Sequence, residues 1–113
     1  MNANMKIKHG PAVAREAEVR QMLVETMHAA AERLGPRTVV LFGSRATGSA
    51  KDRSDFDLGV IGEEPMPFED FYAIDDLIET LPTLYRIDWV DLTRASPKFR
   101  AAALEHADVL YET

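Results

Sequence analysis

Asp55 and Asp57 are the residues of this 113-residue sequence best suited to metal-dependent chemistry, because a single residue separates them. Side chains alternate across a β-strand, so the two carboxylates share one face, about 7 Å apart at the backbone. Carboxylates this close repel each other unless a positive charge lies between them, and hard divalent cations prefer oxygen ligands. An isolated Asp-x-Asp pair is nevertheless most often a solvated strand face. Further ligands are needed before the pair indicates a metal site.

A third carboxylate stands on another strand-like segment further along the chain. Alternation divides this segment into one set with Tyr85, Ile87 and Trp89 and another with Arg86, Asp88 and Val90. If the bulky set is buried, Asp88 emerges on the same side of the sheet as the Asp-x-Asp pair. Asp91 has the opposite parity and is the weaker alternative. Three carboxylates on adjacent strands suit two Mg²⁺ ions, which stabilise the attacking and leaving oxygens of a phosphoryl displacement.

Gly43 and Ser44 directly follow an apolar run over residues 38–42. Glycine lets a backbone approach a ligand closely, and successive N–H groups with a serine hydroxyl form an anion-binding turn. A strand followed by Gly-Ser is also a common turn, so this pair alone indicates little. Arg45 and Arg53 flank the candidate site and could neutralise phosphate charge, although a solvated surface arginine is the simpler interpretation of each.

These residues are expected on one small α+β domain, in which a mixed sheet has helices packed on one face. Residues 11–34 carry an apolar stripe at helical spacing, made of Val19, Met22, Leu23, Met27, Ala30, Ala31 and Leu34. Strands are predicted over residues 38–42, 55–61, 84–92 and 109–111, the last at a sheet edge, and further helices over residues 67–81 and 97–106. Residues 1–11 are predicted to be a flexible tail and residues 12–113 the folded domain.

The composition narrows the classes of function. An apolar content of 46% and a charged content of 28% are ordinary for a globular protein. The formal charge of −6 argues against a surface that binds nucleic acid directly. The absence of cysteine excludes disulfides and thiolate metal sites. No apolar run is long enough to span a membrane, so we expect a cytoplasmic protein.

Taken together, the residues read Gly43-Ser44, ten residues, Asp55-x-Asp57, and then Asp88. This arrangement resembles the GSx10DxD signature of the minimal nucleotidyltransferases of the DNA polymerase β-like superfamily. The residues around both parts, 41–48 and 54–58, resemble that signature as well, and the resemblance covers residues 17–111. It implies the polymerase β-like nucleotidyltransferase fold.

The resemblance also implies a role for each site residue. Gly43 shapes the turn and Ser44 contacts the triphosphate, with Arg45 as a further nucleotide-binding candidate. Asp55 and Asp57 ligate two Mg²⁺ ions, and ATP is the substrate. Asp88 ligates the ion that activates the attacking hydroxyl and is a candidate to accept its proton.

In this family, small members lack the helical domain that binds the acceptor in larger relatives, which implies that a helical partner completes the site. The implied activity is the transfer of AMP from MgATP to a hydroxyl of that partner. The protein would thereby be an antitoxin that neutralises a HEPN-type RNase toxin by AMPylation. The alternative is a nucleotide-binding subunit that acts by forming a complex with a helical substrate-binding partner, with little or no turnover.

Overall fold

The computed structural model describes the backbone of residues 3–51 and 53–113 and the side chains of residues 15–51 and 53–113. At its centre is a mixed four-stranded sheet in the order β3-β2-β1-β4. The strands are β1 (Thr38–Phe42), β2 (Phe56–Ile61), β3 (Ile87–Asp91) and β4 (Asp108–Tyr111). Strand β1 runs antiparallel to β2 and β4, whereas β2 and β3 run parallel. The mixed sheet and the edge position of β4 confirm the prediction.

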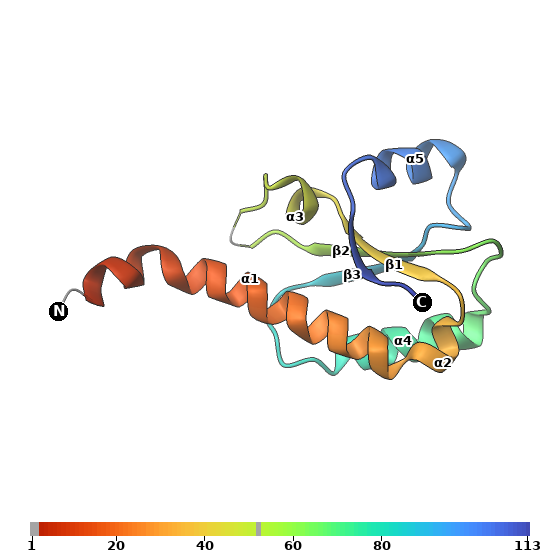
Figure 1. The fold of residues 1–113 in the computed structure, drawn as a ribbon, viewed down its shortest axis with the longest axis horizontal. Coiled ribbons are helices and arrows are strands. Elements are labelled where there is room, and N and C mark those ends of the chain that lie inside the picture. The colour runs from red at the N-terminus through yellow and green to blue at the C-terminus, as the bar shows by residue number, and fades with distance from the viewer. Residues whose placement is uncertain (1–2, 52) are drawn as a thin grey trace.

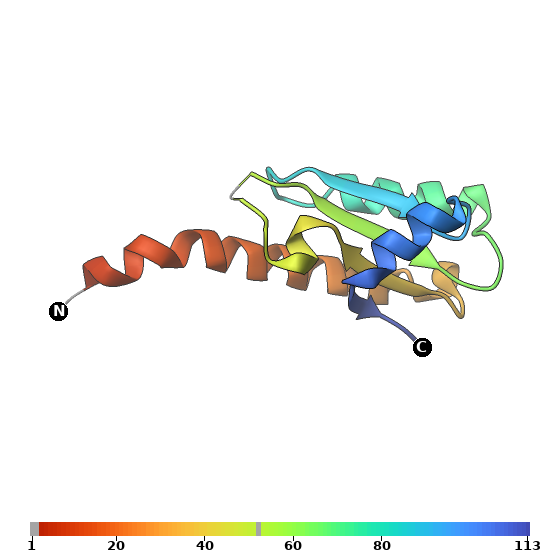
Figure 2. The same ribbon diagram turned by 90° about the horizontal axis from the view of Figure 1, so that it is seen from above.

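Helices lie on both faces of this sheet. They are α1 (Ala3–Ala29), α2 (Ala31–Leu34), α3 (Ser44–Thr47), α4 (Phe68–Glu79) and α5 (Pro97–Glu105). Helices α1, α2 and α4 form the layer on one face, and α5 lies on the other (Figures 1 and 2). The first turns of α1 extend beyond the edge of the sheet (Figure 2). Within the described residues, no helix is both long and apolar enough to cross a membrane.

The main core lies between the sheet and the layer of α1, α2 and α4. Strand alternation builds one side of it, since Phe56, Leu58 and Val60 are fully buried at every second position of β2. The apolar stripe of α1 and α2 builds the other side, where Leu23 and Leu34 are fully buried. The period-two and helical patterns of the sequence therefore meet in one core, and the opposite face of β2 is left for polar side chains.

A second, smaller cluster lies on that opposite face and adds to the predicted single helical layer. Val40 and Phe42 of β1 pack there with Leu92 and with Ala103 of α5. Strand β1 is apolar on both faces, so its second face also needs cover. A Cβ at Gly59 would collide with Leu92, so this glycine allows the close approach of the segment that leads to α5.

Two elements begin three or more residues away from their predicted starts. Helix α1 begins at Ala3, within the predicted tail of residues 1–11, where Gly10 and Pro11 weaken any helical pattern in the sequence. The flexibility of that tail stays a prediction. Strand β3 begins at Ile87 rather than at residue 84. Before it, the backbone N–H of Tyr85 donates a 3.2 Å hydrogen bond to Thr83 Oγ1, which is a local turn contact and not a bond to a neighbouring strand.

Replacing Leu58 by alanine should lower the free energy of unfolding by about 2–5 kcal/mol, because the change leaves a cavity in the main core. Leu58 is fully buried on the central strand β2. Urea denaturation followed by circular dichroism measures the effect. The matched control is Leu84→Ala, because Leu84 is fully exposed and its truncation should change stability by no more than about 0.5 kcal/mol. Equal losses in the two variants would contradict this core assignment.

Candidate active site

Asp57 and Asp88 lie opposite each other on neighbouring strands. The parallel pairing of β2 and β3 aligns these two positions, and it aligns the core residue Leu58 with Trp89. Paired residues of a ladder point to the same face, so both carboxylates stand on the face away from the main core. Asp55 precedes β2 by one residue and has the parity of Asp57. The structure therefore brings together the three carboxylates selected from the sequence.

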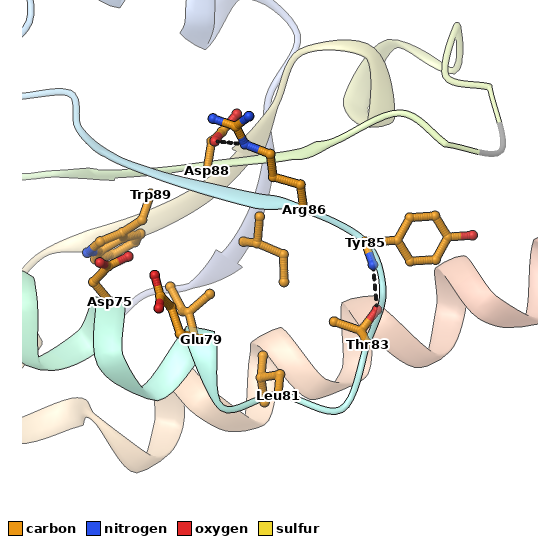
Figure 3. A pocket seen from close by; sticks show the side chains of 10 residues that line it. Asp75, Glu79, Leu81, Thr83, Tyr85, Arg86, Asp88 and Trp89 are labelled. Carbon is orange, nitrogen blue, oxygen red and sulfur yellow. Dashed lines mark hydrogen bonds and ion pairs between the residues drawn. The ribbon is translucent and has the colours of Figure 1, made fainter.

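The side chains of β3 alternate as expected. Figure 3 shows Arg86 and Asp88 on one side of the strand, and Trp89 with Asp75 and Glu79 of α4 on the other. Trp89 Nε1 donates a 3.0 Å hydrogen bond to the Phe71 carbonyl oxygen, which fixes the bulky set beneath α4. Because the bulky set is held there, Asp88 must emerge beside Asp57.

Mutual repulsion marks this cluster. The pKa of Asp57 is raised above its usual range, chiefly by burial and then by the negative charges of Asp88 and Asp55. A hydrogen bond with Asp88 raises it further, whereas the charge of Arg86 lowers it. Burial and two neighbouring carboxylates disfavour the ionisation of Asp57, and a cation would stabilise this environment.

Gly43 brings the turn after β1 against the same carboxylate. Its φ of +75° is in the region that favours glycine, and it directly precedes α3 at Ser44. Phe42, its neighbour, pairs with Asp57 across β1 and β2. A Cβ at position 43 would collide with Asp57 Oδ2. The Gly-Ser turn and the Asp-x-Asp strand, separate in the sequence, are thus in contact at this point.

Asp91, the alternative third carboxylate, has a different environment. It is buried, pairs with Val60 of the core side and accepts 3.0 Å hydrogen bonds from the backbone N–H groups of Met66 and Thr93. Arg94 Nε lies 3.4 Å from its Oδ2. Its oxygens are occupied in holding two loops, which supports the choice of Asp88 made from strand parity.

Arg45, a predicted nucleotide-binding residue, has other partners in this structure, and its contact with a nucleotide stays a prediction. Its side chain is only 5% exposed and forms a 2.9 Å ion pair with Glu16 of α1. Its guanidinium lies 4.4 Å from the centre of the Phe56 ring, on the helix-covered side of the sheet. The backbone of Arg45 stays in the turn after Ser44, but its side chain is directed away from the carboxylate face. The sequence did not reveal this direction because the deciding partner lies far away in the chain.

Arg86 is the neighbour that the sequence reasoning left without a role. Its Nε lies 3.0 Å from Asp88 Oδ1, and its side chain is 75% exposed (Figure 3). The signal was present in the sequence, since Arg86 and Asp88 share a strand face. Arg53, the weaker phosphate candidate, is exposed and lines a hollow with Asp55 and Arg86.

The chemistry of the donor set fits a hard divalent cation, since two further carboxylates lie near Asp57 and their charges disfavour its ionisation. Among residues 15–51 and 53–113, however, no three acidic or histidine side chains are arranged to hold a metal ion as they stand. One oxygen of Asp88 is paired with Arg86 instead.

Access to Asp88 comes from the open edge of β3. A cavity of about 470 Å³ follows this outer strand, and its lining includes Asp88, Arg86 and residues of α4 (Figure 3). Because β3 is the last strand on this side of the described sheet, a group from another molecule can approach Asp88 along the edge.

Known proteins resemble this chain in sequence and in fold. The polymerase beta nucleotidyltransferase family model matches residues 25–113. A Haemophilus influenzae relative named "Probable protein adenylyltransferase MntA" is 46% identical to this chain over 68 residues. The match covers 56% of this chain and 55% of the relative, so the chain spans about half the length of the curated relative it matches. A crystal structure of a toxin–antitoxin with AMP-PNP is 20% identical, with a TM-score of 0.62 over 83% of this chain and 73% of the other. A complex of tri-AMPylated Shewanella oneidensis HEPN toxin with an MNT antitoxin is 18% identical, with a TM-score of 0.56 over the same shares.

In metal-free buffer, Asp57→Asn should raise the melting temperature at neutral pH, because it removes a carboxylate whose ionisation the folded state disfavours. The pKa of Asp57 is raised in the folded protein. Ionisation of Asp57 therefore destabilises the folded state. The loss of stability is complete at a pH above the raised pKa and absent at a pH below the ordinary carboxyl pKa of about 4. The gain in melting temperature should shrink as the pH falls towards about 4. Thermal denaturation at a series of pH values measures it.

Asp91→Asn is the control for that experiment. The amide would place an NH₂ group near backbone donors of Met66 and Thr93 that now meet a carboxylate. We expect a loss of about 1–3 kcal/mol at neutral pH. A melting temperature of Asp57→Asn below that of the wild type at neutral pH would contradict the repulsion described here.

Proposed function

Because this chain belongs to the polymerase beta nucleotidyltransferase family, we propose that it transfers AMP from MgATP to a hydroxyl group of a partner protein. The observation that carries the proposal is the in-register pair of Asp57 and Asp88, with Asp55 beside it and the Gly43 turn in contact with Asp57. Three carboxylates next to a Gly-Ser turn are the components that phosphoryl transfer between oxygens requires.

Asp55 and Asp57 would hold two Mg²⁺ ions together, and Asp88 would ligate one of them. Bound Mg²⁺ neutralises the charge that develops on the phosphate oxygens and makes the attacking hydroxyl more acidic. Gly43 and Ser44 would orient the triphosphate at the turn before α3, where the missing Cβ of Gly43 lets the turn lie against Asp57.

Asp88 is the residue we assign to the acceptor. The acceptor oxygen forms a bond to the α-phosphorus, the bond from that phosphorus to the β-phosphate oxygen breaks, and pyrophosphate leaves. The Asp88 carboxylate takes the proton of the hydroxyl. Its place on β3, an edge strand of the described sheet, supports this role because a group from another molecule can reach it there.

For the acceptor we propose a helical partner, a HEPN-type toxin that this chain neutralises as an antitoxin by AMPylation. The support is the H. influenzae relative, whose name states protein adenylyltransferase activity, and the fold shared with the MNT antitoxin bound to a tri-AMPylated HEPN toxin. The Asp88 side chain on the carboxylate face is 35% exposed, so such a partner can reach it. We place the reaction in the cytoplasm, where ATP is available.

A binding module is the second candidate, and one observation favours it. Among the described residues, no group of three acidic side chains is arranged to hold a metal ion as placed. In this second function the chain would bind a nucleotide and form a complex with its partner, with little turnover. The two functions differ in whether substitution of the carboxylates removes the effect on the partner.

Metal and nucleotide binding can be tested without a partner. MgATP at about 100 times its dissociation constant should stabilise the wild type by about 2.7 kcal/mol, measured as a rise in melting temperature. Asp57→Asn should abolish this rise because it removes a ligand shared by both ions. Asp75→Asn is the matched control, since Asp75 lines the edge cavity from α4 on the other side of β3. A full rise in the Asp57→Asn protein would exclude the proposed ligand set.

Transfer itself is tested by intact mass spectrometry. The proposed partner, a HEPN-type toxin, should gain mass in steps of one AMP residue when it is incubated with this chain and MgATP. Asp88→Asn should lower the rate by about 100-fold or more, because the general base contributes a factor of that order, while Asp75→Asn keeps it. No gain in mass with the wild type, although the two proteins bind, would refute transfer. If the Asp57→Asn variant protects cells from the toxin as effectively as the wild type does, the chain acts as a binding module.

A further inference from the structure

We infer that Arg45 is a positioning residue, whose buried guanidinium holds Asp55 in place relative to the Gly43-Ser44 turn. The inference rests on the proposed function for its meaning in catalysis, but its geometry is independent of it. Arg45 directly follows Ser44 in the chain, and its side chain reaches the start of β2. One residue therefore connects the two parts of the site that the sequence separates by ten positions.

The contacts of Arg45 lie on both sides of Asp55 in the chain. Nη2 donates a 2.8 Å hydrogen bond to the carbonyl oxygen of Ser54, the residue before Asp55. The guanidinium carbon lies 4.4 Å from the ring centre of Phe56, the residue after it. With the backbone before it and the ring after it both held, Asp55 has little freedom to shift, although it stands just outside the ladder of β2.

A second aromatic ring extends this contact to β3. The guanidinium carbon lies 5.0 Å from the ring centre of Tyr85, which meets the Phe56 ring edge-on at 5.4 Å. Tyr85 stands in the segment that enters β3 towards Asp88. Arg45 thus contacts the approaches to both strands that carry carboxylates.

Helix α1 holds Arg45 in this position. Glu16 Oε1 accepts a 2.9 Å hydrogen bond from Arg45 Nη1, and Arg20 Nη2 donates a 3.1 Å hydrogen bond to the Arg45 carbonyl oxygen. Arg20 also pairs with Asp108 of β4 at 3.3 Å. The side chain and the backbone of Arg45 are therefore both anchored to α1, and α1 is anchored to the far edge of the sheet.

The chemistry of the position requires arginine. A buried cation is costly unless its charge and its donors are satisfied, and the Arg45 side chain is only 5% exposed. The planar guanidinium donates hydrogen bonds from separate N–H groups to Glu16 and to the Ser54 carbonyl oxygen, and its face covers an aromatic ring. An ammonium group has one nitrogen and no flat face, so lysine cannot keep all these contacts.

A residue that only stabilises the fold would explain the burial of Arg45 equally well, so the test must separate stability from positioning. The variant is Arg45→Lys, and the matched control is Arg33→Lys. Arg33 forms an ion pair of the same 2.9 Å length with Asp70, between α2 and α4 on the side of the sheet away from the carboxylates. Both variants lose the fork of one arginine, but only Arg45 contacts the residues on either side of Asp55.

The readouts are the Mn²⁺ dissociation constant of the chain alone, from titration by electron paramagnetic resonance, and the melting temperature. At a temperature where each variant is folded, Arg45→Lys should weaken Mn²⁺ binding by about 10-fold or more, as the loss of residues that orient metal ligands does. Arg33→Lys should leave it unchanged. Where transfer to the partner is measured, Arg45→Lys should lower kcat and leave the KM for ATP nearly unchanged.

If Arg45→Lys does not fold, Glu16→Gln replaces it, since this change weakens the anchor and keeps Arg45. It should weaken Mn²⁺ binding in the same direction. Wild-type Mn²⁺ affinity in a folded variant, whatever its melting temperature, would overturn the inference. Because the Mn²⁺ titration needs neither ATP nor a partner, an absence of AMP transfer in the wild type would refute the proposed function and leave this inference standing.

Discussion

Repulsion between carboxylates at the junction of β2 and β3 is the constraint around which this domain is organised. Parallel pairing places Asp57 opposite Asp88, and strand parity adds Asp55, so that burial and two negative charges raise the pKa of Asp57. Such an arrangement destabilises the metal-free fold. Apolar packing on the other face of the same strands must offset that cost, and strained electrostatics of this kind concentrate at functional sites.

The alternation of a β-strand therefore serves stability and chemistry at the same time. Phe56 and Leu58 are fully buried against the helical layer, and the aspartates between and before them stand on the opposite face. The turn at Gly43 closes on this face because β1 pairs with β2 directly beside it. Hydrogen bonds from Arg45 to Glu16 of α1 and to the Ser54 carbonyl oxygen then hold the segment that leads into β2, which lies outside the ladder.

Much of this was predictable from local patterns. Strand β1 occupies residues 38–42 as predicted, and the parity of β2 and β3 correctly put Asp88, rather than Asp91, beside the Asp-x-Asp pair. These inferences succeeded because they depend on period-two alternation, a property of the strand itself. The start of α1 and the second layer made by α5 were not predicted, since they depend on packing between distant segments.

The sequence by itself determined the set of chemical groups: a Gly-Ser turn, three carboxylates with matching parity, and a family signature that joins them. Only the tertiary structure decided how those groups are directed. Arg45 adjoins Ser44 in the chain, and the sequence predicted a phosphate contact, yet its guanidinium turns to Glu16 and the Phe56 ring. Arg86 turns to Asp88. A long cationic side chain takes its direction from the carboxylates and rings that folding brings near, and residue type and spacing alone do not contain that information.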